Sequence, residues 1–398
     1  MSFQQPARFL TAALFSAAIN TAWADIEFSG KVDLEASLFS ETASHSQQKD
    51  SNLSVLIQPQ WVWQDEDQNN LVQFSPMLRV DQNDSNRSHG DIRELYWIHV
   101  QNDWELRTGL RKEFWGVTEF QHLVDVINQT DQVENVSGEE KLGQPMVNLS
   151  LIRETGIWDF YLLPSFRERT FASIEGRPSY GLNVSKNATY ESSDKDRHLD
   201  AAIRWSQNFD WLDLSLSAFK GTNREPVLKA SLENGQAVLV PHYEQMTQFG
   251  GTAQVIEGDW LLKLELIYRD SSSTQYSAIQ TGFEYTLYAI ADSDIDLGLI
   301  SEYGWDERGK SATSIMQNDL FGGLRFAFND EAGTEILAGV GRDLDFDTTS
   351  FSAEASQRLN NDWKISGEMR MVEANNRADP LYSFRKDDYI KGTLSWYF

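Results

Sequence analysis

The chain of 398 residues carries 60 acidic and 34 basic side chains, a formal net charge of −26, and no cysteine. This acidity excludes nucleic acid as a partner, because phosphate recognition requires basic surfaces, and the missing cysteines exclude disulfides. Aromatic residues are abundant, with 13 Trp, 13 Tyr and 22 Phe, yet no window after residue 24 approaches the roughly 18 apolar residues of a membrane helix.

Residues 1–24 have the pattern of a secretory signal. Arg8 precedes an apolar core over residues 9–19, and the alanines at positions 22 and 24 form the A-x-A motif of a cleavage site after residue 24. The apolar run is too short to be a membrane anchor. We therefore expect export, with residues 25–398 forming one mature domain.

Apolar and polar residues then alternate in segment after segment. Such a period of two is typical of strands with one apolar and one polar face. The pattern predicts about 18 strands, with 16 as the alternative count, each of the length that crosses an outer membrane. They are expected at 25–39, 53–63, 70–81, 91–101, 104–112, 146–154, 156–166, 198–208, 211–221, 245–257, 259–269, 277–290, 294–304, 317–329, 332–342, 348–358, 362–373 and 387–398.

The connections between these strands alternate between short and long. A membrane protein without apolar helices must be a closed sheet, because only closure satisfies every backbone polar group. The sequence thus predicts an all-β fold, a transmembrane antiparallel up-and-down β-barrel with long extracellular loops, in a bacterial outer membrane. Outer-membrane lipid and lipopolysaccharide are the expected surroundings. The last strand, ending on Phe398, should close the barrel against residues 26–38 and be recognised by the assembly machinery.

The polar faces of the strands supply candidates for the interior. Arg79, Arg93, Arg107 and Arg111 lie on three consecutive strands, and such a file of arginines would favour anions. The alternative is a salt-bridged interior that only supports the wall. The full set of pore-lining candidates is Arg79, Arg93, Arg107, Arg111, Glu113, Arg204, Lys263, Glu265, Arg269, Arg325 and Arg370.

The third long connection, residues 113–145, is too apolar for a simple solvent-exposed excursion. We expect it to fold into the barrel and narrow the pore; a lid packed at the rim is the alternative. A second connection, near residues 164–177, is expected to pack against it. The candidates for the constriction are Trp115, Gly116, Asp125 and Asn128.

This region resembles a motif of poorly characterised porin-like barrels of Gram-negative bacteria. In that group a strand ending in G-x-R leads to W-G and then to D-x-I-N, as Gly109 to Arg111, Trp115-Gly116 and residues 125–128 do here. The resemblance covers about residues 91–172 and implies an outer-membrane location and a pore-like fold. It implies no substrate or catalytic residue. Many relatives place proline after the asparagine, where this chain has Gln129.

The sequence therefore predicts a passive channel for small polar or anionic solutes. The alternatives are an export channel for a polysaccharide or lipid-derived molecule, and a structural barrel plugged by its loops. No enzyme is expected, since the best pair, His122 with Asp125, fits a local hydrogen bond better than a catalytic dyad. No cofactor, metal site or catalytic residue is predicted, and the oligomeric state is left open.

Overall fold

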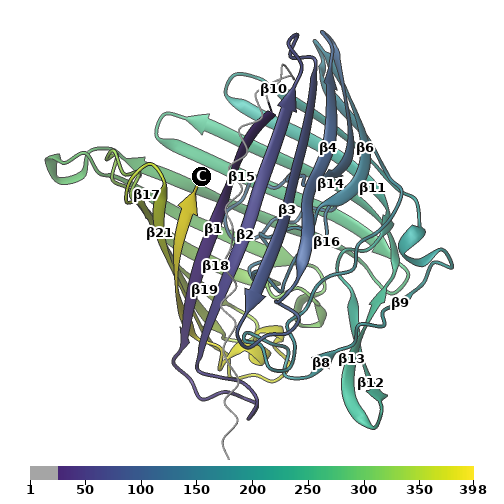
Figure 1. Ribbon diagram of the computed structural model, residues 1–398, viewed down its shortest axis with the longest axis vertical. Helices are drawn as coiled ribbons and strands as arrows, with labels where there is room; N and C mark the ends of the chain where they lie inside the picture. The colour runs from purple at the N-terminus through teal and green to yellow at the C-terminus, as the bar shows by residue number, and fades with distance from the viewer. Residues whose placement is uncertain (1–25) are drawn as a thin grey trace, which may run out of the picture.

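The computed structural model describes residues 26–398, so the signal sequence expected at residues 1–24 lies outside the described residues. Eighteen antiparallel strands form one sheet, which closes where β1 (Ile26–Phe39) pairs with β22 (Tyr389–Tyr397). Figure 1 shows the purple first strand beside the yellow strands at the C-terminal end. The structure confirms the up-and-down barrel and its 18 strands.

Each barrel strand pairs with the barrel strands before and after it in the chain. Every predicted strand corresponds to an observed one, with ends that differ by no more than three residues. The strands between the two that close the barrel are β2 (Ser51–Gln64), β3 (Asn70–Asp81), β4 (Gly90–Val100), β5 (Trp104–Arg111), β6 (Gln144–Arg153), β7 (Gly156–Leu163), β10 (Asp200–Asn208), β11 (Leu212–Thr222), β14 (Gln245–Glu257), β15 (Trp260–Ser271), β16 (Gln275–Leu287), β17 (Asp296–Asp306), β18 (Asn318–Ala327), β19 (Glu335–Asp343), β20 (Thr349–Arg358) and β21 (Trp363–Glu373).

The register at the closing seam places apolar and polar side chains on opposite faces of the wall. Leu34 is opposite Leu394, and Asp33 is opposite Ser395. Leu34 faces outward and is 50 % exposed, whereas Asp33 faces inward and is buried. The outer face therefore presents apolar side chains where lipid would lie, as the alternation of the sequence predicts.

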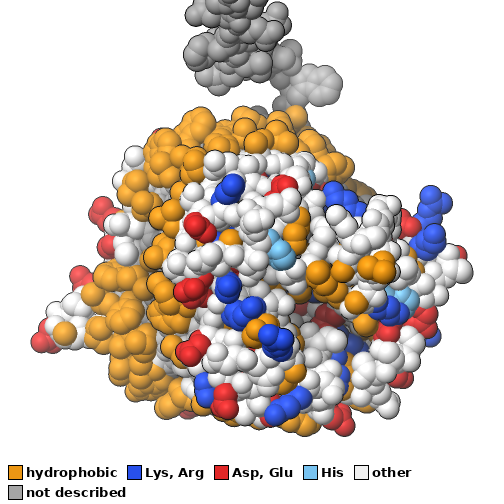
Figure 2. Space-filling view, turned by 90° about the horizontal axis from the view of Figure 1, so that it is seen from below, with side chains coloured by type: hydrophobic (Ala, Val, Ile, Leu, Met, Phe, Trp, Pro, Cys, Tyr) orange, Lys and Arg blue, Asp and Glu red, His pale blue; other side chains and the backbone are white. Residues whose placement is uncertain are grey.

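The long connections gather at one end of the barrel, at the bottom of Figure 1. Viewed from that end, charged side chains are spread over the face, while hydrophobic side chains cover much of its left flank (Figure 2). These connections contain three short 3-10 helices, η1 (Lys195–Arg197), η3 (Gly309–Ser311) and η4 (Pro380–Phe384), and a fourth, η2 (Ile290–Asp292), lies in the short connection between β16 and β17 at the other end. Among residues 26–398, no helix has the length and apolar character needed to span a membrane.

A second, four-stranded sheet joins two of these connections, in which the sequence pattern predicted no strands. It contains β8 (Asn183–Val184), β9 (Thr189–Tyr190), β12 (Val227–Glu233) and β13 (Gln236–Tyr243). The β12–β13 hairpin turns at Asn234-Gly235, and both residues have positive φ. This dipeptide is the strongest local signal for a two-residue hairpin, so the sequence did contain a sign of the missed strands.

Candidate functional site

Residues 112–143, which connect β5 to β6 and are called the inner loop below, pack against the inner face of the barrel. The loop has almost no regular secondary structure, but its apolar side chains form the main hydrophobic core. Water is excluded there because the loop and the wall bury each other's apolar surface. The core contains Trp115, Val124, Val126 and Ile127 of the loop and Met146, Tyr161, Leu163, Ala202, Phe219, Met246, Ile267, Tyr276 and Ala278 of the wall.

Two carboxylates of the wall bind the backbone of the inner loop. Glu265 on β15, which has no exposed surface, accepts hydrogen bonds from the amides of Val117 (2.6 Å) and Val124 (3.2 Å). Glu302 on β17 accepts from the amides of Glu119 (2.7 Å) and Phe120 (3.1 Å). Buried backbone donors outside helices and strands need such acceptors. The two glutamates therefore hold the loop inside the barrel.

The four residues predicted for the constriction come together within the inner loop. Asp125 accepts hydrogen bonds from the amides of Trp115 (2.7 Å) and Gly116 (3.0 Å). Asn128 accepts from the amide of Glu113 at 2.8 Å. At position 116 a Cβ atom would lie only 2.4 Å from Nδ1 of His122, so glycine is required. These residues thus organise the fold of the loop itself.

The tip of the inner loop reaches the opposite wall. The ring of Phe120 stacks on that of Phe321 with centroids 4.7 Å apart. It also occupies space that glycine leaves on β18 and β19. A Cβ at Gly339 would lie 3.0 Å from the Phe120 ring, and one at Gly323 would lie 3.4 Å from it. The aromatic ring of Phe120 therefore packs against the wall where Gly323 and Gly339 have no side chains.

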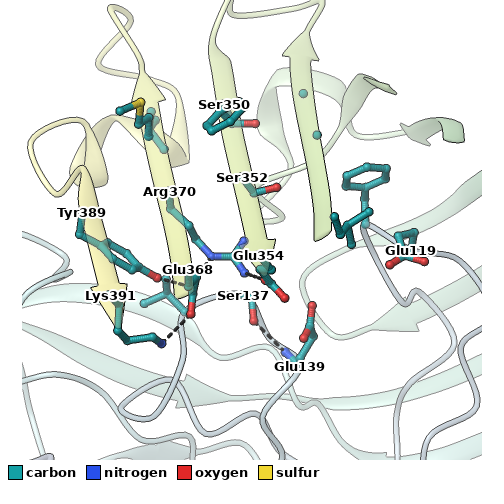
Figure 3. Close-up of a pocket in the computed structure, with 18 of the residues that line it drawn as sticks. Glu119, Ser137, Glu139, Ser350, Ser352, Glu354, Glu368, Arg370, Tyr389 and Lys391 are labelled. Carbon is teal, nitrogen blue, oxygen red and sulfur yellow. Dashed lines mark hydrogen bonds and ion pairs between the residues drawn. The ribbon is translucent and has the colours of Figure 1, made fainter. Parts of the chain in front are cut away.

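A cavity of about 820 Å³ remains between the inner loop and strands β18–β22. On β21 its lining runs from Lys364, beside the short turn to β20, to Val372 at the end where the long connections lie. Ser137 and Glu139 of the inner loop face this wall (Figure 3). The cavity therefore extends along almost the whole height of the barrel on this side.

A network of ion pairs covers the β20–β22 side of the cavity (Figure 3). Glu368 accepts from Arg370 at 2.7 Å and from Lys391 at 2.5 Å, and the hydroxyl of Tyr389 also donates to it. Arg370 reaches Glu354 on the next strand at 2.8 Å. Two carboxylates and two cations leave this network with no formal net charge, so it presents dipoles to the cavity without a strong field.

A second network joins the loop to the wall. Arg325 on β18 pairs with Glu119 of the inner loop at 2.7 Å and with Glu284 at 3.2 Å. Lys263 lies 3.6 Å from Glu119. The first network joins neighbouring strands, whose register places inner-face side chains side by side. In the second, Arg325 reaches Glu284 on β16 across Gly298 of the intervening β17.

The arginines of the predicted basic stripe are on the inner face, but each has an acidic partner. Arg79 pairs with Glu35 and Glu134, and Arg93 pairs with Asp131. Arg107 pairs with Glu105 on its own strand, and Arg111 pairs with Glu113. The stripe therefore has little net positive charge, which corresponds to the salt-bridged alternative considered from the sequence.

The remaining candidates from the sequence are distributed between the core and the cavity. Arg204 lies over the Trp115 ring, 5.8 Å from its centroid. Arg269 is buried, where it pairs with Glu225 at 3.2 Å. Of all the candidates for the pore lining, Arg325 and Arg370 line the cavity. Glu354, Tyr389 and Lys391 were not singled out, although alternation along β20 and β22 already places them on the polar face.

The connection that follows β7, near residues 164–177, contacts the inner loop, as the sequence predicts. Thr170 and Asp131 form an isolated parallel bridge, and the hydroxyl of Thr170 donates to Asp131 at 2.5 Å. Arg169 donates to the side chain of Gln129 at 3.1 Å. These contacts join the inner loop to the connection that follows β7.

The charge of His122, beside a carboxylate that holds the inner loop, is expected to make the attachment of this loop sensitive to pH. Its Nδ1 lies 3.7 Å from Glu265. Burial acts to lower the pKa of His122, but Glu265 and Asp125 more than offset this effect and raise the pKa above 6.5, against a smaller effect of Lys141. A raised pKa contributes stability that is complete below the ordinary value and is lost as pH rises through the raised value. The loop should be held best in mild acid.

In planar bilayers we expect any current through the barrel to become noisier as pH rises through the raised pKa of His122, because the side chain loses its charge there. His122→Gln should remove most of this dependence. His242→Gln, at a histidine of β13 in the loop sheet, is the matched control and should keep it. Equal pH dependence in the native protein and in His122→Gln would contradict this assignment.

No group of three or more His, Cys, Asp or Glu side chains within residues 26–398 is arranged to hold a metal ion.

Comparison with known proteins gives only a distant structural likeness. No family model and no curated protein matches the chain. Among solved structures, two engineered mutants of a porin from Rhodopseudomonas blastica are similar at 13 % identity, with TM-scores of 0.46 and 0.45. Each alignment covers 94 % of this chain and 100 % of the porin. Values this low assign neither a family nor a function.

Proposed function

We propose that this protein is a passive outer-membrane channel for small polar solutes, and that the inner loop narrows its pore. The cavity between the loop and strands β18–β22 carries the proposal, because its lining follows β21 from Lys364 to Val372. A closed barrel of 18 strands is wide enough to enclose an aqueous passage. Its apolar outer face suits a lipid environment.

The membership suggested by the sequence motif is part of the same proposal. The W-G and D-x-I-N segments meet where Asp125 binds the amides of Trp115 and Gly116. These residues fix the fold of a loop that points inward. Barrels whose pores are narrowed by such a loop would be expected to share them. Asp125 accepts hydrogen bonds in this role, and we assign it no catalytic role with His122.

Single-channel recording in planar bilayers tests the proposal directly. A steady conductance supports an open channel, whereas a folded barrel that inserts without conducting would support the plugged structure. Block of the current by a polysaccharide or a lipid-derived molecule would favour the export alternative. Contact with lipopolysaccharide and recognition of the C-terminal strand by the assembly machinery are also proposed, since the outward apolar face and the closing strand suit them.

The charge of the cavity does not favour anions. Seven carboxylates line it (Glu119, Glu139, Glu335, Glu354, Glu368, Asp387 and Asp388), against four cationic side chains (Arg325, Lys364, Arg370 and Lys391). Most of the cations are ion-paired, and the arginines of the predicted stripe are neutralised by their own partners. We therefore propose a weak preference for cations in place of the anion preference considered from the sequence.

We expect the reversal potential in a potassium chloride gradient to show this cation preference, and Glu139→Gln to reduce it. Glu139 is exposed at the cavity and faces the strand wall (Figure 3), so its charge acts directly on passing ions. Glu154→Gln, in the exposed turn between β6 and β7, removes an equal charge away from the cavity and serves as the control. Anion preference in the native channel would contradict the proposed selectivity while leaving the channel itself intact.

A further inference from the structure

Two buried aspartates face each other where the wall meets the long connections. Asp319 on β18 and Asp343 on β19 are register partners. They are 4 % and 2 % exposed. Directly opposed residues of antiparallel strands have Cβ atoms about 5 Å apart, and like charges in this arrangement are destabilising. The amides of Gln317 (2.7 Å) and Asn318 (3.1 Å) donate to Asp319 and offset part of this repulsion, but only a positive charge or a proton would neutralise the pair.

The nearby arginines are engaged with other carboxylates. Arg308 pairs with Asp306 at 2.6 Å, and Arg342 pairs with Asp347 at 2.7 Å. The other carboxylate that acts on Asp319 is Asp379, which adds negative charge. Buried charges are normally paired with a group of opposite sign. In the described part of the chain, neither aspartate of the opposed pair has such a salt bridge.

A third side chain, Gln317, suggests that the group neutralising the two aspartates is a cation. Gln317 is 1 % exposed, and its Nε2 donates to Asp343 at 2.6 Å. Its Oε1, on the same amide group, is buried without a hydrogen-bond partner. A buried acceptor with no donor requires an explanation. This oxygen belongs to an amide that its Nε2 already fixes beside Asp343.

We propose that Asp319, Asp343 and Gln317 bind one Ca²⁺ ion at the loop end of β18 and β19. Carboxylate and amide oxygens are the ligands that calcium prefers, and water can complete its shell. The donor set contains two carboxylates and an amide, so it is not the three-carboxylate group that residues 26–398 lack. A site with so few charges should bind weakly, with a dissociation constant of about 10⁻⁴–10⁻³ M, as in extracellular modules.

Backbone hydrogen bonds connect the site to the surrounding loops. Asp343 also accepts from the amides of Asp345 (2.7 Å) and Phe346 (2.9 Å). Thr348 of the same connection donates to Asp379, in the connection before β22. Calcium bound at Asp343 would therefore stabilise the connections beside the cavity mouth, where Met316 lies one residue before Gln317. This inference does not depend on the proposed channel function.

Calorimetric titration of the full-length barrel in detergent, after treatment with a chelator, tests the site with calcium chloride as the probe. We expect one calcium ion per barrel. Asp319→Asn and Asp343→Asn should each weaken binding by roughly 10–100-fold. Asp347→Asn, at the exposed aspartate of the β19–β20 connection, is the control and should bind as the native protein does.

The competing explanation is that the two aspartates share a proton. Either asparagine variant is close to isosteric and removes a like charge, so it should fold. Under the calcium proposal, calcium raises the unfolding temperature of the native protein and raises that of Asp343→Asn much less. If the native protein does not bind calcium, or if both asparagine variants bind it equally well, the proposal is wrong.

Discussion

Replacing Glu265 with alanine is expected to release the middle of the inner loop from the barrel wall. The amides of Val117, Thr118 and Val124 would lose the carboxylate that accepts their hydrogen bonds. Hydrogen bonds to a charged group are each worth about 1.5–3 kcal/mol, and removing three of them together should detach this segment without unfolding the barrel. The single-channel current should then become noisier, with a higher mean conductance.

Hydrogen exchange measures the same change directly. The amides of residues 117–124 should exchange much faster in Glu265→Ala, and Glu265→Gln should give an intermediate result because one carbonyl oxygen remains. Glu284→Ala is the matched control, since Glu284 is also an inner-face carboxylate but pairs with Arg325 instead of the loop backbone. Unchanged exchange and unchanged noise in a folded Glu265→Ala barrel would show that the loop is held by its apolar core alone.

Placing a tryptophan at Ser352 is expected to close most of the proposed pore. Ser352 lines the cavity from β20, opposite the inner loop. A bulky ring there would occupy space that solute and ions need, so the conductance should fall several-fold while the barrel remains folded. Ala353→Trp is the control on the next residue of the same strand. Ala353 lies in the alternate register, beside Ala338 and Met369, on the outer face.

The two tryptophan variants therefore separate the lumen from the lipid face. Ala353→Trp adds the same volume to the membrane side, where aromatic residues are tolerated, and should conduct like the native protein. Equal conductance in both variants would mean that ions pass elsewhere in the barrel. A loss in both would indicate a defect in folding or insertion instead of a blocked pore.

The barrel itself was predictable because one physical rule governs every strand. A wall between lipid and water requires side chains to alternate, and this alternation can be read from residues such as Leu34 and Asp33 without knowing their neighbours. The apolar character of residues 113–145 also predicted a loop packed against the wall. These predictions needed only the pattern of residues within one strand or one short segment.

The neutralisation of the arginine stripe depends on contacts between distant segments. Arg79 and Arg93 are on the wall, but Glu134 and Asp131, which neutralise them, come from the inner loop. Nothing in the local sequence around either arginine indicates that partner. The position of the cavity depends likewise on where the Phe120 tip meets Gly323 and Gly339. Side-chain pairing across the lumen therefore has to be seen in the structure.

The position of the cavity has a consequence for how such a protein can change. Its strand lining comes from β18–β22, the last part of the chain, whereas the hydrophobic core that holds the inner loop involves earlier strands. Exchange of β20–β22 between related barrels, which leaves the Phe120 contacts on β18 and β19 in place, would alter what passes through without disturbing the buried support of the loop. The residues that set selectivity and the residues that support the loop would then lie in different strands. Mutations could change one set without loss of the other.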